Sequence, residues 1–145
     1  MRRWWLAGAA LALLSAGSGC ETVDLGPPPA EVNACMPGQM WFVNQIWPNF
    51  LAKDYGGKHC TDSSCHGSGS KTTMTLVNPV DPVTYPLTGD WANNYAQAAH
   101  EMNCADVKDS SLLLLPEGVQ VHGGNQLIMK DGPEAMLVEQ WITQP

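Results

Sequence analysis

The sequence predicts a small, mostly α-helical domain with long loops, and three observations lead to this fold class. The chain has 145 residues, which allows one domain and excludes a TIM barrel or a two-domain enzyme. Apolar residues recur at helical spacing in separate stretches. Residues 67–90 are rich in Gly, Ser, Thr and Pro and have little periodicity, which is typical of a long loop.

The first predicted helix covers residues 38–55. Gly56 and Gly57 are expected to end it, because adjacent glycines favour non-helical backbone. Pro48 is expected to kink this helix or to begin a new turn. Its apolar positions are Trp41, Phe42, Val43, Ile46, Trp47, Phe50 and Leu51.

The second predicted helix runs from Trp91 to Met102, and Asp90 is expected to be its N-cap. The side chains expected to face the core are Trp91, Tyr95, Ala98, Ala99 and Met102.

Two further helical segments are predicted near the C-terminus. Ser110 or Ser111 is expected to cap a short helical turn over residues 112–115. The last helix opens at the sequence that begins with Asp131, with Pro133 in its first turn. The residues expected to share one face of this helix are Met136, Leu137, Gln140 and Trp141.

A secretory signal peptide is predicted over residues 1–19. Arg2 and Arg3 precede an uncharged apolar stretch, and small residues follow it. The apolar stretch, residues 4–14, is too short to span a bilayer. The signal places the following domain in an oxidising compartment outside the cytoplasm.

Cys20 stands where lipoprotein signal peptides have their acylated cysteine. The run from Ala16 to Cys20 resembles a lipobox, which implies that Cys20 becomes the lipidated N-terminus; an ordinary signal peptide with an incidental Cys20 is the alternative. Residues 20–33 contain three consecutive prolines and predict a semi-rigid tether, so the domain covers 34–145. Because Glu21 is not the Asp that retains lipoproteins in the inner membrane of enteric bacteria, we expect a lipid anchor in the outer membrane. The domain would then lie in the periplasm or at the cell surface.

The charge of the chain argues against two classes of function. The full sequence has a formal net charge of −7, and removal of residues 1–19 leaves five lysines against fourteen acidic residues, a net charge of −9 without any arginine. An acidic chain does not suit nucleic-acid binding by phosphate neutralisation. A chain without arginine lacks the forked donor that phosphate and carboxylate sites normally use.

The segment from Cys60 to His66 contains the most informative motif. It reads Cys-Thr-Asp-Ser-Ser-Cys-His, and two cysteines with a histidine directly after the second are typical of covalent c-type haem attachment. The thiols of Cys60 and Cys65 would form thioethers with the porphyrin vinyl groups, and His66 would supply an axial nitrogen to the iron. Gly67 would let the backbone pass close to the ring.

The spacing of this motif leaves alternatives open. The usual motif has two residues between the cysteines, whereas this one has four, a known minority variant in which the additional residues must bulge outward. A single thioether through Cys65, with Cys60 free or in a disulfide, is one alternative. Two others are a disulfide framework without haem and a zinc site of Cys60, Cys65, His66 and one more histidine, which is uncommon in exported proteins. A core this small normally needs disulfides, a metal or a cofactor.

The order of the elements and motifs resembles a known family. An aromatic helix precedes the cysteine motif and another helix, 133–143, ends the chain, as in class-I-like cytochromes, in which these two helices cross. Over most of residues 41–142 the sequence is similar to the small cytochrome-c-like domains of exported lipoproteins from bacteria such as myxobacteria and planctomycetes. This resemblance implies a cytochrome-c-like helical domain with one covalent haem c. It rests on Phe42, Val43, Ile46, Pro48, Cys60, Cys65, His66, Gly67, Asp109, Ser111, Leu112, Leu113, Leu114, Pro116, His122, Gly123, Gly124, Val138, Trp141 and Ile142.

The sixth ligand of the iron has two candidates. His122 follows a loop and precedes two glycines that would permit close approach to a flat ring. Met129 is the alternative, since His/Met ligation occurs in cytochromes c, and an open position is the third interpretation. Met102 and Met136 are expected in the core, and His100 is expected to face solvent or to be capped.

Cys35 and Cys104 remain for the domain. In an exported chain, two remaining cysteines most simply pair. A Cys35–Cys104 disulfide would fasten the start of the domain to the loop after the second helix, with a stabilisation of roughly 4 kcal/mol in the entropic model.

These observations predict a c-type haem-binding lipoprotein that transfers electrons at the cell envelope. Its acidic surface would suit a basic redox partner. The alternatives are a haem-based sensor with an open sixth site and a disulfide-stapled binding lipoprotein without a cofactor. We do not expect an enzyme, because the mature chain has no arginine to assist peroxide cleavage and the sequence shows no hydrolase triad or phosphate loop.

Overall fold

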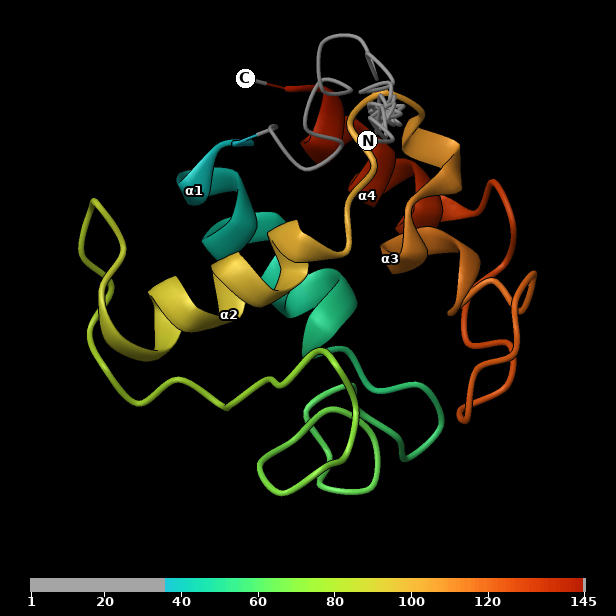
Figure 1. The fold of residues 1–145 in the computed structure, drawn as a ribbon. Coiled ribbons are helices and arrows are strands. Elements are labelled where there is room, and N and C mark those ends of the chain that lie inside the picture. The colour runs from blue at the N-terminus through green and yellow to red at the C-terminus, as the bar shows by residue number, and fades with distance from the viewer. Residues whose placement is uncertain (1–35, 145) are drawn as a thin grey trace, which may run out of the picture.

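The computed structural model describes residues 36–144, in which helices joined by long loops form the fold and no strand is present. The predicted mostly α-helical class is confirmed. In chain order the elements are α1 (Gln39–Trp41), η1 (Phe42–Leu51), α2 (Gly89–His100), η2 (Val107–Asp109), α3 (Ser111–Leu114) and α4 (Pro133–Thr143) (Figure 1). The predicted signal peptide, Cys20, the tether and Cys35 lie outside the described residues. No helix within 36–144 is long and apolar enough to cross a membrane.

The first helix is shorter than predicted and has an unusual winding. α1 continues directly into η1, a π-helix, which ends at Leu51. The predicted end at Gly56 is therefore wrong. Pro48 lies inside η1, and because proline has no N–H, the carbonyl groups of the preceding turn need other donors. Beside the proline, the Asn49 side chain donates to the Gln45 carbonyl at 2.9 Å.

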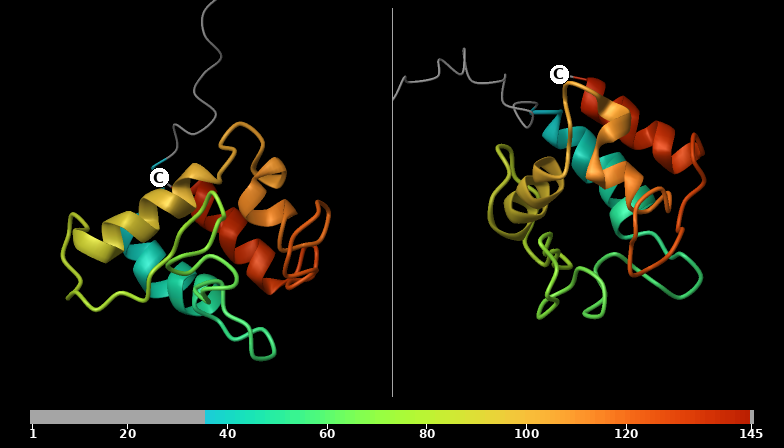
Figure 2. Two further views of the ribbon diagram at one scale, coloured as in Figure 1. Left: turned by 60° about the horizontal axis from the view of Figure 1, so that its bottom comes forward. Right: turned by 45° about the vertical axis from the view of Figure 1, so that its right-hand side comes forward.

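An aromatic cluster joins η1, α2 and α4 at the centre of the core. The ring centroid of Phe42 in η1 lies 5.4 Å from that of Trp141 in α4 and 5.5 Å, edge-on, from that of Tyr95 in α2. The Trp141 indole N–H also donates to the Gly38 carbonyl at 3.2 Å. Figure 2 shows α4 packed beside η1, the closest pairing of long helices in the fold.

The inward face of α4 is rotated by one residue from the predicted face. Pro133 stands in the first turn, as predicted. Met136 is 55% exposed, so its predicted place in the core is wrong, whereas Met102 is buried as predicted. Two sets of residues in α4 recur at helical spacing, and spacing alone does not decide which set faces the core. In the structure the set with the smaller side chains faces the core. Its members are Ala135, Val138, Trp141 and Ile142.

The N-terminus of α2 is capped from a distance. The helix begins at Gly89 with Thr88 as the N-cap residue, so the predicted N-cap Asp90 is wrong. The Asp90 N–H donates to the carboxylate of Asp81 at 3.2 Å. The Asp81 side chain, in the long loop, thus accepts from an N–H at the start of α2, where the sequence suggested a cap from within the helix itself.

The side-chain amides of two α2 residues, Asn94 and Gln97, hold the long loop between η1 and α2 against that helix. Asn94 is fully buried; its Oδ1 accepts from the Val77 N–H at 3.0 Å, and its amide donates to the Val77 carbonyl at 2.8 Å. Gln97 accepts from the Thr75 N–H at 3.0 Å. These bonds satisfy loop backbone groups that no strand or helix would pair.

α3 is the short turn predicted over 112–115, and it lies at Ser111–Leu114. Ser110 precedes it, as predicted, but its side chain caps no donor of α3. The buried Ser110 hydroxyl accepts from the Asn103 N–H at 2.9 Å instead, which fastens α3 to the segment after α2.

Candidate haem site

Residues Cys60 to Gly67 form a compact turn closed by its own backbone. The His66 N–H donates to the Cys60 carbonyl at 2.9 Å, and the N–H groups of Cys65 and Gly67 both donate to the Asp62 carbonyl at 2.8 Å. Cys60, Cys65 and His66 all line one hollow at the surface. The longer cysteine spacing therefore still brings the three predicted site residues together.

The additional residues of the motif and its glycine have separate steric roles. Ser63 and Ser64 are exposed, so they bulge outward as predicted. Gly67 is buried, and a Cβ atom there would overlap the carbonyl oxygen of Thr61. Glycine is required because the turn packs against its own backbone, which is a different reason from the predicted approach to a ring.

His66 is held from three directions in a neutral form. Besides the bond to Cys60, its carbonyl accepts from the Leu76 N–H at 2.6 Å, and its Nδ1 lies 3.1 Å from the Met74 carbonyl oxygen. Because a carbonyl only accepts, Nδ1 carries the proton and Nε2 keeps its lone pair. Burial is the main cause that lowers the pKa of His66, and the Met74 contact opposes it. The neutral imidazole is the form that binds a metal.

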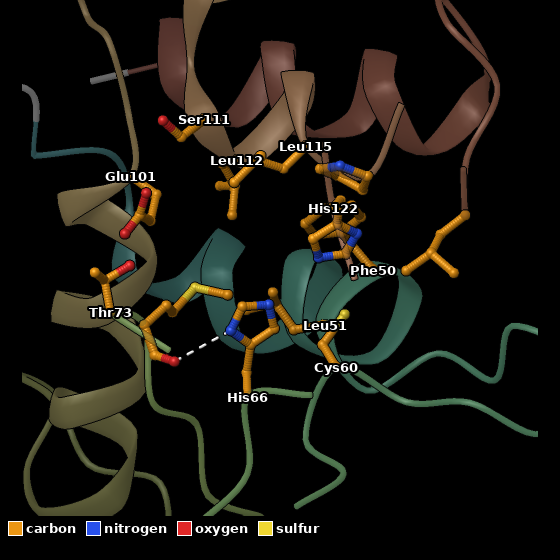
Figure 3. A pocket seen from close by; sticks show the side chains of 13 residues that line it. Phe50, Leu51, Cys60, His66, Thr73, Glu101, Ser111, Leu112, Leu115 and His122 are labelled. Carbon is orange, nitrogen blue, oxygen red and sulfur yellow. Dashed lines mark hydrogen bonds between the residues drawn. The ribbon is translucent and has the colours of Figure 1, made fainter. Parts of the chain in front are cut away.

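The imidazole of His122 faces that of His66 across the cleft (Figure 3). The two ring centroids are 5.9 Å apart, and the ring planes differ by 16°. The Nδ1 of His122 lies 3.4 Å from the Asn125 carbonyl oxygen, which leaves its Nε2 as a second available ring nitrogen. A Cβ atom at Gly124 would come within 3.3 Å of the His122 ring, so the glycine gives the ring room.

The spacing of the two imidazoles fits one metal ion between them. If both Nε2 atoms point at the same ion, metal–nitrogen bonds of about 2 Å, with about 1.1 Å from each nitrogen to its ring centre, give a centroid separation of about 6 Å. The observed separation is 5.9 Å. Within residues 36–144 no group of three His, Cys, Asp or Glu side chains is arranged so that it could hold a metal ion. A metal that brings its own equatorial ligands, as haem iron does, needs only two axial nitrogens.

The cysteines of the described region fall into two kinds. Cys60 and Cys65 are free thiols. Burial, followed by the nearby Cys65, raises the pKa of the Cys60 thiol to about 11, so this thiol is protonated at neutral pH. Cys104 is disulfide-bonded, and its predicted partner Cys35 lies outside the described residues. A framework that pairs Cys60 or Cys65 in a disulfide is not found.

The cleft has an apolar body and a polar edge. Its cavity volume is about 50 Å³, and the adjoining hollow beside residues 60–67 has a volume of about 310 Å³. Thr73, Glu101 and Ser111 form the polar edge (Figure 3). The apolar walls are Phe50, Leu51, Met74, Leu112, Leu115, Pro116 and Leu127. This cleft adjoins the hollow beside the Cys60–Gly67 turn. Four side chains line both the cleft and the hollow: Cys60, His66, His122 and Leu127.

The other candidates from the sequence lie away from this cleft. Met129 is 66% exposed and lines neither hollow. The structure therefore brings His122, and not Met129, to His66. His100 is exposed on α2, as predicted.

Three supporting residues of the site were not predicted. Met74 and Asn125 orient the two imidazoles through their backbone carbonyls, which any residue type supplies. Asn94 fixes the loop next to His66, and a lone asparagine in a helix gives no indication of such a role. Only the amphipathic pattern of α2, which places position 94 beside the inward-facing Tyr95, could have suggested it.

No protein-family model matches this chain, and neither the curated proteins nor the solved structures give a match. The site is therefore interpreted from its own geometry and from the sequence motif.

Proposed function

We propose that this chain is a cytochrome-c-like lipoprotein that binds one haem c and transfers electrons at the cell envelope. The observation that supports this most directly is the His66–His122 pair, 5.9 Å apart between ring centroids and beside two free thiols. Two imidazoles, two thiols and an apolar cleft are the residue types that a covalently bound haem requires. When bound, haem supplies an iron that takes up and releases one electron.

Cys60 and Cys65 would hold the group covalently. Each thiol adds across a vinyl double bond, so that a carbon–sulfur bond forms and the thiol hydrogen goes to the other vinyl carbon, with no oxidant needed. The closed turn between the cysteines holds both sulfurs beside His66. We therefore expect two thioethers in spite of the longer spacing.

His66 and His122 would supply the two axial nitrogens. In both rings Nδ1 faces a backbone carbonyl, closely in His66 at 3.1 Å and more loosely in His122 at 3.4 Å, which leaves Nε2 free. Two histidines imply a lower reduction potential than a His/Met pair, since methionine raises it. The apolar walls would exclude water from the porphyrin faces.

The lipid anchor at Cys20 would hold the domain at the outer membrane, in the periplasm or at the cell surface. The mature chain has a net charge of −9, which would steer a basic redox partner toward it. Conversion of Cys20 to Ser should release the protein from the membrane fraction and remove the acyl mass. A C20S chain that stays with the membrane would contradict the anchor.

The axial ligands can be tested by absorption spectra of the protein made with the haem-maturation machinery. Wild type should show a Soret band and the spectrum of a six-coordinate low-spin haem. His122→Ala should keep the haem but change its spin state, and the matched control His100→Ala should leave the spectrum unchanged. A His122→Ala spectrum identical to that of wild type would show that His122 is no ligand. A wild-type protein without a Soret band would favour a binding lipoprotein without a cofactor.

The attachment can be tested on the thiols. Cys60→Ser and Cys65→Ser should each retain haem through one thioether after denaturation, and the double variant should lose it to solvent extraction. Ser63→Ala, in the same turn and exposed, is the control. Wild type should give the pyridine haemochrome spectrum of two saturated vinyl groups; if wild type and Cys60→Ser both give the spectrum of one saturated vinyl group, a single thioether through Cys65 is correct instead.

A further inference from the structure

The two histidines of the site differ in how firmly the fold holds them. His66 has backbone bonds on both sides, to Cys60 at 2.9 Å and from Leu76 at 2.6 Å, and its ring contacts the Met74 carbonyl at 3.1 Å. The loop that supplies these partners is fastened to α2 through the fully buried Asn94. Movement of His66 would therefore break several bonds to separate parts of the domain.

His122 lies at the tip of the loop between α3 and α4. The base of this loop is fixed, because the Leu127 and Ile128 N–H groups donate to the Pro116 carbonyl at 2.8 and 3.1 Å, and Val119 donates to Leu114 at 3.0 Å. The hydrogen bonds of the tip, residues 121–126, all close within the loop itself in the described structure.

Several further features show that little holds this tip. Val121, next to His122, is 99% exposed. A Cβ atom at Gly123 would meet nothing within 4 Å. The Nδ1 contact of His122 is 3.4 Å long, which is at the weak end of hydrogen bonding. Segments with few buried contacts open at low free energy, so His122 can swing out without disturbing the core.

The space beside His122 is apolar. Leu112, Leu115 and Leu127 line the cleft with it. No lysine or arginine lines this cleft, and the one charged side chain on its edge is the carboxylate of Glu101. Lys58 lines the adjoining hollow, which His122 also lines, so the nearby charges are of both signs. The apolar walls of a place vacated by the His122 imidazole would favour a small neutral ligand.

We propose that His122 is a displaceable axial ligand, and that its departure opens a binding place for a neutral diatomic gas such as carbon monoxide or nitric oxide. This inference rests on the proposed function, because it requires the haem. The bond from the His122 Nε2 to the haem iron would break and the gas would bind in its place, with no electron or proton transferred. Gas binding would stop electron transfer, so the same site would respond to the gas.

Carbon monoxide is the probe for the test, with rapid mixing of the reduced holoprotein. In wild type the observed rate should level off as the gas concentration rises, because release of His122 becomes limiting. In His122→Ala the rate should rise linearly and exceed that of wild type by about tenfold or more at the highest concentration. His100→Ala should behave as wild type.

A second variant tests the loop tip without removing the ligand. Gly123→Ala is sterically tolerated and should restrict the tip, which lowers the limiting rate about two- to fivefold. Hydrogen exchange of the oxidised protein gives a readout apart from gas binding: the amides of 121–126 should exchange faster than those of 62–76.

The outcomes separate this inference from the proposed function. If wild type binds no carbon monoxide while His122→Ala does, His122 is a fixed ligand and the inference is wrong, although the haem proposal stands. If wild type and His122→Ala bind the gas at the same linear rate, His122 is no ligand and the inference fails. Absence of any Soret band would instead overturn the haem proposal itself.

Discussion

Asn94 links the stability of the domain to the placement of His66, and its replacement by alanine is a sharp test of this link. The side chain is fully buried and makes two hydrogen bonds to Val77, at 3.0 and 2.8 Å. Next to Val77, the Leu76 N–H donates to the His66 carbonyl at 2.6 Å. Asn94→Ala leaves a partly buried N–H and C=O without partners.

The magnitude follows from the two lost bonds. Each unsatisfied buried group costs about 1–3 kcal/mol, and the partial exposure of the Val77 contacts places the sum at about 2–4 kcal/mol. Alanine has a higher helix propensity than asparagine, which stabilises α2 by about 0.5 kcal/mol and offsets part of this loss. We expect Asn94→Ala to lower the free energy of unfolding by about 2–3 kcal/mol.

Urea unfolding followed by circular dichroism measures this change on the purified protein. Asn93→Ala is the matched control, because Asn93 is exposed on the same helix and gains the same propensity; we expect it to lie within about 0.5 kcal/mol of wild type. Hydrogen exchange of residues 66–77 should accelerate in Asn94→Ala alone. If the two variants unfold at the same urea concentration with equal slopes, Asn94 does not hold the loop and the reasoning is refuted.

Three further predictions concern the turn, the core and the thiol. Gly67→Ala should sharply reduce haem attachment, because its Cβ atom overlaps the backbone of the turn; the Soret absorbance per protein checks this, and equal absorbance for Gly67→Ala and the exposed control Ser68→Ala would contradict it. Trp141→Ala should cost about 3–5 kcal/mol in chemical unfolding, whereas Met136→Ala on the exposed side of α4 should cost under about 0.5 kcal/mol; similar costs would show that the assigned inward face is wrong. In protein without haem, alkylation of Cys60 should accelerate about tenfold per pH unit between about pH 8 and 10, because its pKa is raised to about 11 and only the thiolate reacts; a rate that levels off below pH 9 would contradict the buried thiol.

The sequence predicts a helix correctly where its apolar residues fit only one placement of that helix. The start of the last helix agrees with the sequence because Pro133 marks its first turn, whereas the short turn at Ser111–Leu114 agrees in place although Ser110 does not cap it. The N-terminus of α2 was misplaced, because Asp81, distant in sequence, caps the Asp90 N–H. The π winding of η1 around Pro48 is not indicated by the apolar pattern, which predicts a helix but not its type.

The sequence alone indicates the residue types of the candidate site, but not the backbone groups that contact its two histidines. The cysteine motif and the His-Gly-Gly segment named both histidines, and the structure places their rings 5.9 Å apart. The fold, and not the sequence, shows that His122 lies near His66 while Met129 is exposed, since both residues belong to the same loop. The orienting carbonyls of Met74 and Asn125 depend on loop conformation alone, and side-chain identity does not predict it.

The most direct test of the central claim is the intact mass of the mature protein, made with the haem-maturation machinery and treated with an alkylating reagent after denaturation without reduction. The account predicts the mass of the processed chain plus one haem, with neither Cys60 nor Cys65 alkylated. A mass without haem, in which both thiols take up the reagent or form a disulfide, would contradict it.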